Sequence, residues 1–225
     1  MNVRNLLSLT LAACLLSGVA LAKKEDLPQV SHDGLELRKE KGQVADVVYV
    51  RPGVDFSVYR RIAILECPVA FSKDWERDRK RGPMRVSQKD MDRMKADLSA
   101  EFLKVFTDEL QAKGGYTIVK EGAEDVLILR PAIIDLEVTA PDTMSAGRSY
   151  TLSESSGAMT LYLELFDSVT GQILARAIDR QEDSGTGRIQ WQNGVTNKAE
   201  ADRVLRRWAS ALRTRLDGVH AGKAP

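Results

Sequence analysis

Residues 159–180 read MTLYLELFDSVTGQILARAIDR, and they give the clearest structural signal in the chain. In the first half, apolar residues alternate with polar or aromatic ones, and a repeat of two residues is typical of a β-strand. The segment DSVTG at residues 167–171 contains glycine and predicts a turn, after which residues 172–180 return as a second strand. Because both arms are long, we expect this hairpin to lie in the centre of a sheet.

Two amphipathic helices are predicted outside the hairpin. Residues 87–113 place apolar side chains at steps of three and four, with Ser87 as the N-cap and Gly114-Gly115 as the end. The apolar face consists of Met91, Met94, Leu98, Phe102, Val105, Phe106 and Leu110. The second helix lies near the C-terminus and is expected to be capped by Asn197 with Glu200. Its apolar face consists of Val204, Leu205, Trp208, Ala211, Leu212 and Leu216.

Further strands are predicted from apolar and β-branched runs at residues 47–50, 60–71, 116–120 and 125–139. Pro68 interrupts one of these runs and predicts an edge, a bulge or the end of the strand. Pro131 interrupts another and predicts a bulge. The order of elements is strand, strand, helix, strand, strand, hairpin, helix. This order predicts the α+β class, with two main helices packed on one face of a mostly antiparallel sheet.

The first 22 residues have the pattern of a secretory signal peptide. A cationic residue precedes an apolar run, and Ala20 and Ala22 stand at the −3 and −1 positions before Lys23. This spacing predicts cleavage before Lys23 and release into the periplasm. A Leu-Ala-Ala-Cys motif inside the run also fits a lipobox, in which Cys14 would be lipidated and would tether the protein to the outer membrane. The residues after Cys14 stay apolar, so cleavage before Lys23 is favoured.

The chain is therefore expected to have four parts. These are a signal peptide at 1–22, a flexible N-terminal arm at 23–45, a single α+β domain at 46–218 and a tail at 219–225. No transmembrane span is expected after residue 22. Removal of the signal peptide would leave 203 residues with a formal net charge of zero.

The composition excludes several classes of protein. Lys and Arg total 33 while Asp and Glu total 32, whereas nucleic-acid-binding domains are usually basic. Two His and two Cys are too few for a zinc finger, an iron–sulfur site or an internal disulfide scaffold. P-loop, G-x-S-x-G and H-E-x-x-H motifs are missing from the sequence, and we expect no cofactor and no metal. Cys67 lies in an apolar run and is expected to be buried and inert.

Tryptophan and arginine residues in two polar segments are the candidates for binding a partner, because both residue types are enriched at interface hot spots. Residues 72–85 are predicted as a net basic loop, whose tryptophan either contacts a partner or covers part of the core. Residues 181–197 are polar and rich in glycine. The candidate binding patch consists of Trp75, Arg77, Arg79, Arg188 and Trp191. An envelope protein or a cell-wall component would be the partner.

Two other functions remain open at this point. Paired carboxylates can carry out hydrolysis, so Asp135, Glu137 and Glu164 are candidates for a hydrolase of unknown substrate. Strand alternation would place Asp135 and Glu137 on one face, where solubility alone also explains them. A carrier of a lipid or another apolar ligand would need an apolar cavity, which a sequence does not reveal.

Several segments resemble the bacterial family catalogued as domain of unknown function 3313. The resemblance spans residues 45–217 and includes Trp191. The matching segments are YVRPGVDFSVY at 49–59, GAEDVL at 122–127, residues 161–171, VTN at 195–197 and AEAD at 199–202. Members are exported proteins, often lipoproteins, with no established activity, so the resemblance implies no catalytic residues. It implies an exported envelope protein, and we favour a non-enzymatic binding or accessory component over an enzyme.

Overall fold

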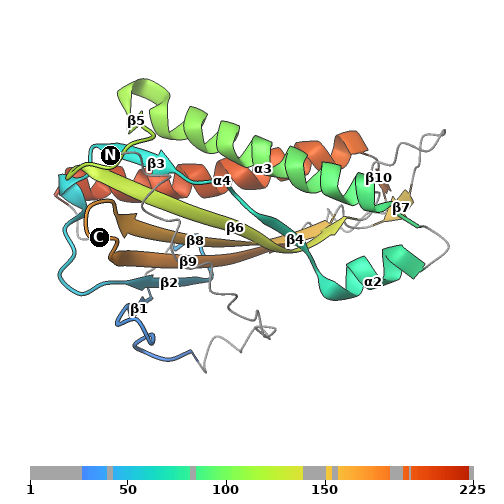
Figure 1. The fold of residues 1–225 in the computed structure, drawn as a ribbon, viewed down its shortest axis with the longest axis horizontal. Coiled ribbons are helices and arrows are strands. Elements are labelled where there is room, and N and C mark those ends of the chain that lie inside the picture. The colour runs from blue at the N-terminus through green and yellow to red at the C-terminus, as the bar shows by residue number, and fades with distance from the viewer. Residues whose placement is uncertain are drawn as a thin grey trace.

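The computed structural model in Figure 1 has the α+β fold predicted from the sequence: a mostly antiparallel sheet with two long helices on one face. The structure describes residues 27–39, 43–81, 85–138, 151–153, 157–182, 190–192 and 194–222. The predicted signal residues Cys14, Ala20, Ala22 and Lys23 lie outside these ranges.

The main sheet has eight strands in the spatial order β1-β2-β9-β8-β6-β3-β5, with β4 also paired to β6. The strands are β1 (Glu36–Arg38), β2 (Val47–Val50), β3 (Arg61–Ile64), β4 (Val69–Phe71), β5 (Thr117–Ile118), β6 (Val126–Val138), β8 (Gly157–Asp167) and β9 (Ile173–Glu182). β3 pairs in parallel with β5 and β6, and β4 pairs in parallel with β6, while the other pairs are antiparallel. A separate two-stranded sheet pairs β7 (Thr151–Ser153) with β10 (Gln190–Gln192).

The predicted hairpin is confirmed as β8 and β9, which lie in the middle of the sheet. Tyr162 stands opposite Ile178 in the antiparallel register. In the turn, the Asp167 carboxylate accepts the backbone N–H groups of Val169 and Thr170 at 3.1 and 2.7 Å. An aspartate that binds its own turn in this way fixes the register of both strands.

Three α-helices are described: α2 (Lys73–Arg81), α3 (Gln88–Gln111) and α4 (Gly194–His220), with 3-10 turns at Phe56–Val58 and Ala112–Gly114. Ser87 caps α3 as predicted, because its hydroxyl accepts the N–H of Asp90 at 3.1 Å. The expected cap at Asn197 is wrong, since α4 begins three residues earlier at Gly194. Within the described ranges, none of the helices combines the length and the apolar character that a membrane span needs.

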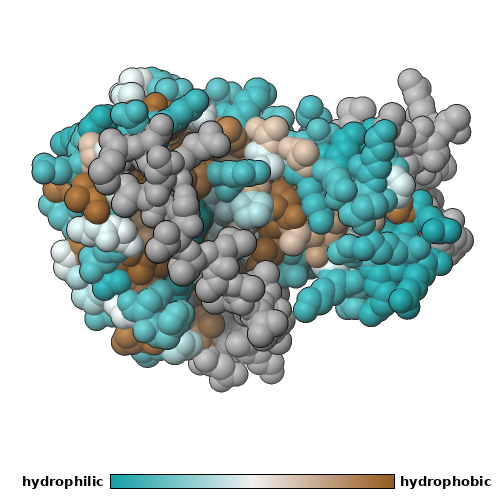
Figure 2. All heavy atoms as spheres, in the orientation of Figure 1, coloured by the Kyte–Doolittle hydropathy of each residue, from teal (hydrophilic) through white to brown (hydrophobic). Residues whose placement is uncertain are grey.

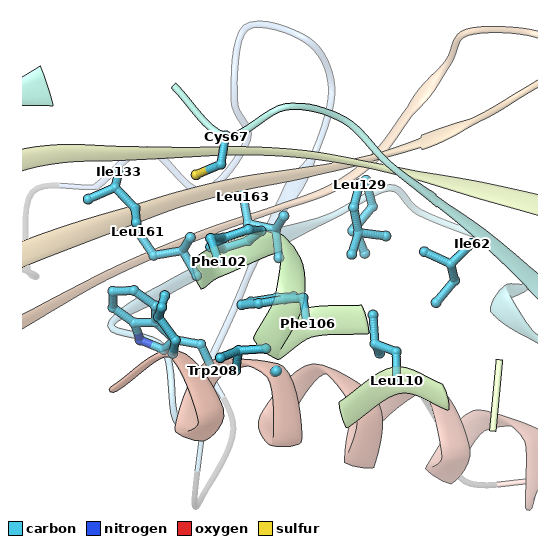
Figure 3. Close-up of a cluster of buried hydrophobic side chains, with 14 of the residues drawn as sticks. Ile62, Cys67, Phe102, Phe106, Leu110, Leu129, Ile133, Leu161, Leu163 and Trp208 are labelled. Carbon is cyan, nitrogen blue, oxygen red and sulfur yellow. The ribbon is translucent and has the colours of Figure 1, made fainter. Parts of the chain in front are cut away.

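The hydrophobic core lies between the sheet and the helices α3 and α4 (Figure 3). Phe102 and Phe106 of α3 stack with ring centroids 3.9 Å apart, and both are fully buried. Leu129 and Leu163 from the sheet and Trp208 from α4 close around them. Each such buried side chain contributes roughly 1.5–3 kcal/mol relative to exposure, so this cluster holds the layers together.

A single arginine joins the C-terminal ends of the two long helices. Arg213 of α4 donates from Nη1 to the carbonyl oxygens of Glu109, Leu110 and Ala112, at 3.0 to 3.1 Å. These carbonyls lie at the end of α3, where they have no partner within the helix and where a cation is favoured. Gly115 leaves the space for the guanidinium, because a Cβ there would lie 2.3 Å from Nη1. The two helices therefore run in the same direction with their C-terminal ends fixed together.

Residues 72–85 were predicted as a basic loop, and this prediction is wrong, because residues 73–81 form α2. Ion pairs along the helix surface support it, with Lys80 to Glu76 at 2.6 Å and Arg77 to Asp74 at 2.8 Å. The segment lacks an apolar stripe, which is the sequence signal by which helices are detected. Figure 2 shows α2 as a hydrophilic part of the surface.

The predicted strand at 60–71 is divided into β3 and β4. Pro68 lies in the gap, and it has no N–H to donate to a neighbouring strand. Its carbonyl still accepts the N–H of Ile133, so the segment stays attached to β6 across the gap.

The arm predicted to be flexible is folded over residues 27–38, which we call the N-terminal strap. Its strand β1 pairs with β2 and forms one edge of the sheet, which Figure 1 shows below β2 and away from α3. Leu35 of the strap is fully buried. The Asp33 carboxylate pairs with Arg176 of β9, and the hydroxyl of Tyr49 donates to the carbonyl of Pro28 at 2.9 Å. An apolar anchor and an ion pair thus hold a segment that is polar overall.

At the other end of the chain, α4 continues through His220 into the predicted tail. The Tyr116 hydroxyl lies 3.2 Å from Nδ1 of His220. This contact places the last helical turn against the segment that leads into β5.

Replacing Asp33 by Asn should loosen the strap. Burial raises the pKa of Asp33, but hydrogen bonds from Ser31 and Arg176 outweigh it and lower the pKa to about 2. A carboxylate with a lowered pKa stabilises the fold above its unfolded pKa, about 3.9, and this contribution is lost as the pH falls toward 2. At pH 7 the free energy needed to open the strap should be about 1–3 kcal/mol lower in the variant than in the wild type. Hydrogen exchange at the amides of Gly34 and Leu37 measures this difference.

The difference between wild type and Asp33→Asn should shrink as the pH falls from about 4 to 2. Asp108 is exposed on α3, so Asp108→Asn serves as the matched control and should leave strap exchange unchanged. Equal exchange in wild type and Asp33→Asn at pH 7 would show that the ion pair does not hold the strap.

Candidate functional site

A groove of about 490 Å³ lies between the middle of α3 and the N-terminal half of α4, next to the ends of β6 and β8. The apolar lining consists of Met94, Leu98, Ala100, Leu136, Val138, Ala158, Met159, Ala201 and Val204. Volumes between roughly 300 and 1,000 Å³ are typical of small-molecule sites, so the groove is the leading candidate for a functional site in the described part of the chain.

The groove follows from the sizes of the side chains between the helices. Toward the C-terminal ends, Phe106 and Trp208 fill the space, and Arg213 holds the helix ends together. Toward the N-terminal ends, the facing positions carry small residues, including Ala100 on α3 and Ala201 on α4. The helices therefore share a filled core at one end and leave a groove at the other.

A β-bulge shapes the floor of the groove. Ile134 of β6 stands opposite Thr160 of β8, but Glu137 stands opposite Ala158, so β6 holds one extra residue between these two pairs. Asp135 lies in the bulge with a φ of 51°, a conformation that is uncommon for residues other than glycine. The bulge was predicted at Pro131 instead, where the ladder continues without a shift in register. It breaks the alternation that was expected to place Asp135 and Glu137 on one face.

Gly157 allows β6 and β8 to approach at this floor. Its φ is 141°, and a Cβ at this position would lie 2.1 Å from the carbonyl oxygen of Glu137. No side chain fits there without movement of the backbone. Two unusual backbone conformations, at Asp135 and Gly157, thus lie at the base of one groove, and such conformations cluster at functional sites.

Charged side chains surround the groove at its rim. Three of the acidic residues are paired: Glu101 with Lys104 at 3.5 Å, Glu200 with Arg203 at 2.6 Å, and Glu137 with Arg180. The surface around the groove therefore carries both signs of charge, while the interior is aliphatic.

A buried carboxylate supports one wall. Asp179 of β9 is 1% exposed and accepts Nε1 of Trp208 and Nε2 of Gln181, each at 2.6 Å. Burial raises the pKa of Asp179, although these hydrogen bonds act in the opposite direction. Gln181 lines the groove and accepts from Arg207 at 2.7 Å, so its side chain is fixed from two sides. A sequence offers no local sign of this cluster, because its members come from different elements.

The residues of the predicted binding patch have different environments. Trp75 stacks on Phe71 with ring centroids 4.4 Å apart, and its Nε1 donates to the carbonyl of Val138 at 2.8 Å. Trp75 is therefore partly buried against the core. Its hydrogen bond joins it to Val138, which lines the groove. Arg79 lies 5.7 Å from the Trp75 ring, and Arg77 pairs with Asp74.

The rest of the predicted patch is not placed. Arg188 lies outside the described residues. Trp191 belongs to β10, but its side chain is outside what the structure describes. The patch as a whole therefore stays a prediction.

Glu164 is buried, with 3% of its surface exposed. One carboxylate oxygen accepts from Arg130, and the other accepts from Arg176 and from the Tyr162 hydroxyl. Both carboxylate oxygens of Glu164 thus accept hydrogen bonds. They lie on the sheet face where Arg176 pairs with Asp33 of the strap. Arginines on two neighbouring strands and Asp33 of the strap complete an ion network around the buried Glu164 carboxylate.

Cys67 is 2% exposed, and burial raises the pKa of its thiol to about 12. A thiol with so high a pKa stays protonated and is a poor nucleophile. The predicted burial of Cys67 is confirmed, and the raised pKa is consistent with an unreactive thiol.

The sequence matches the profile of a family described as "Protein of unknown function (DUF3313)" over residues 29–212. The chain belongs to this family. The resemblance seen in the sequence is therefore confirmed. No curated protein matches the chain.

Several solved structures show a partial likeness. The PelC dodecamer from Paraburkholderia phytofirmans is 13% identical, with a TM-score of 0.38 over 74% of this chain and 96% of that one. A DUF4136 protein from Bacteroides thetaiotaomicron VPI-5482 is 10% identical, with a TM-score of 0.35 over 75% and 94%. A DUF330 protein from Xanthomonas campestris is 14% identical, with a TM-score of 0.34 over 73% and 86%. Scores this low support no conclusion about function.

Replacing Gly157 by Ala should deform the groove floor and lower stability by about 3 kcal/mol, since the new Cβ combines an unfavourable φ with a collision against Glu137. Gly171→Ala is the matched control, because Gly171 has a φ of 68° but an added Cβ would meet no atom within 4 Å. The control should lose about 1 kcal/mol. Urea unfolding measures both, and equal losses would show that β6 and β8 are not tightly opposed at Gly157.

Proposed function

We propose that this DUF3313 protein is an exported, non-enzymatic binding or accessory component of the bacterial cell envelope, and that it binds an apolar group in the groove between α3 and α4. The observation that carries the proposal is the aliphatic lining of a groove of about 490 Å³. An apolar group that entered the groove would be removed from water together with this aliphatic lining, which is favourable.

The arrangement of acidic residues supports binding over hydrolysis. Glu164 lies on the opposite face of the sheet from the groove and is held by two arginines. Glu137 lines the groove, whereas Asp135 lies in the bulge of β6. A glycosidase-type mechanism requires two carboxyl groups across one substrate bond, and the three predicted candidates are not brought together in this way.

Export is supported by the N-terminal sequence pattern and by the family resemblance. We propose a soluble periplasmic protein that begins at Lys23, with a lipoprotein that begins at Cys14 as the alternative form. An envelope protein or a cell-wall component could then supply the apolar group.

Intact-mass measurement of the native protein from separated cell fractions tests the proposed location. We expect a species that begins at Lys23 in the periplasmic fraction, because Ala20 and Ala22 fit the signal-peptidase preference. Recovery of a lipidated species that begins at Cys14 in the membrane fraction would show that the protein is a tethered lipoprotein and not a soluble periplasmic protein. A full-length mass in the cytoplasm would contradict the proposal of export.

Filling the groove tests the proposed binding site. A naphthalene sulfonate dye should fluoresce on binding to the wild-type protein, and Ala201→Trp should weaken dye binding at least tenfold, because the indole would occupy the groove. Ala221→Trp is the matched control, since Ala221 is exposed beyond the end of α4. Both variants should keep the Tm of the wild type within a few degrees. Dye binding that is equal in all three proteins would exclude the groove as the binding site.

A further inference from the structure

We propose that the occupant of the groove is one unbranched acyl chain of a lipid with a zwitterionic head group, and that the head group lies at the charged rim. The inference rests on the proposed binding function and narrows it to one class of ligand.

The chemistry of the lining favours a hydrocarbon chain. Aliphatic side chains and alanines form the interior, and no aromatic ring lines the groove in the described part of the chain. Sugars and nucleobases are usually held by stacking on aromatic faces, and such faces are missing from this lining. Met94 and Met159 come from the helix layer and the sheet, and methionine adapts its shape to flexible apolar ligands.

The floor of the groove offers no strand edge to an extended peptide. On β6, Leu136 is paired with Phe71 of β4 on one side, and its neighbour Glu137 is paired with β8 on the other. On β8, Ala158 lies between Glu137 of β6 and Glu182 of β9. Because the backbone at the floor is already used within the sheet, recognition by strand addition is excluded there.

The size of the groove also favours a small ligand over a protein. The groove runs along α3 from Met94 to Lys104, which is about 15 Å at the usual rise per residue. It is lined by 17 residues, whereas each side of a standard protein interface has about 20–30. A single extended acyl chain fits a site of this length.

The charges at the rim fit a head group that carries both signs. Lys198 on α4 and Asp97 on α3 are exposed and stand on opposite walls, and neither has an ion pair among the described residues. A phosphate near Lys198 and an ammonium near Asp97 would satisfy both. A free fatty acid, which is only anionic, would satisfy Lys198 alone.

Monomeric lysophosphatidylethanolamines with chains of about 8 to 16 carbons, kept below their micelle concentrations, test the proposal. They should displace the naphthalene sulfonate dye from the full-length mature protein. Affinity should rise up to about fourfold for each added methylene group and then level off when the groove is full. A fatty acid of equal length should bind at least threefold more weakly, because it lacks the ammonium group.

Variants connect this binding to the groove. Ala201→Trp should weaken lysolipid binding at least tenfold, and Ala100→Trp on the facing helix provides the same test if the first variant folds poorly. Asp97→Asn should reduce the preference for the lysolipid over the fatty acid, because it removes the charge that pairs with the ammonium group, whereas Ala221→Trp should change neither affinity.

The outcomes separate the two proposals. Dye binding that depends on the groove but is not displaced by any chain length would overturn the acyl-chain inference and leave the binding function standing. Dye binding that is insensitive to Ala201→Trp and Ala100→Trp would overturn both. Equal affinity for the fatty acid and the lysolipid would overturn the zwitterionic head group.

Discussion

The contact between Arg213 and the last carbonyls of α3 determines how the helical layer is arranged. The end of a helix leaves several carbonyl groups without partners inside the helix. The guanidinium of Arg213 donates to three of them, and those of Leu110 and Ala112 also accept the N–H groups of Tyr116 and Gly115. This fixes the two helices side by side, in the same direction, at one end only. Close packing around Phe106 and Trp208 follows at that end, while small residues at the other end leave the groove.

The two faces of the sheet are stabilised by different interactions. On the helix face, apolar side chains are buried between layers, and Asp179 is a buried exception with three hydrogen-bond donors. On the other face, Glu164 and its two arginines form an ion network to which Asp33 attaches the N-terminal strap. Glu164 and Arg176 are the buried members of this network, and removing either one is destabilising because the other charge stays buried.

Elements with strong local periodicity could be predicted from the sequence. The hairpin of β8 and β9 and the helix after Ser87 are examples, since their signals lie within a few neighbouring residues. The helix α2 could not be predicted in this way, because it is stabilised by salt bridges on its surface and has no apolar stripe. The bulge at Asp135 and the groove depend on residues from separate elements. The ion network around Glu164 likewise includes Asp33, which is far away in the sequence and is joined to it through Arg176.

The position of the strap sets the orientation of the domain relative to its own N-terminus. The chain enters the described structure on the sheet face that lies away from α3 and α4, and ionic contacts hold it there. The groove lies on the helix side. The first described residues and the groove therefore lie on different sides of the domain, so a ligand in the groove would not contact the strap.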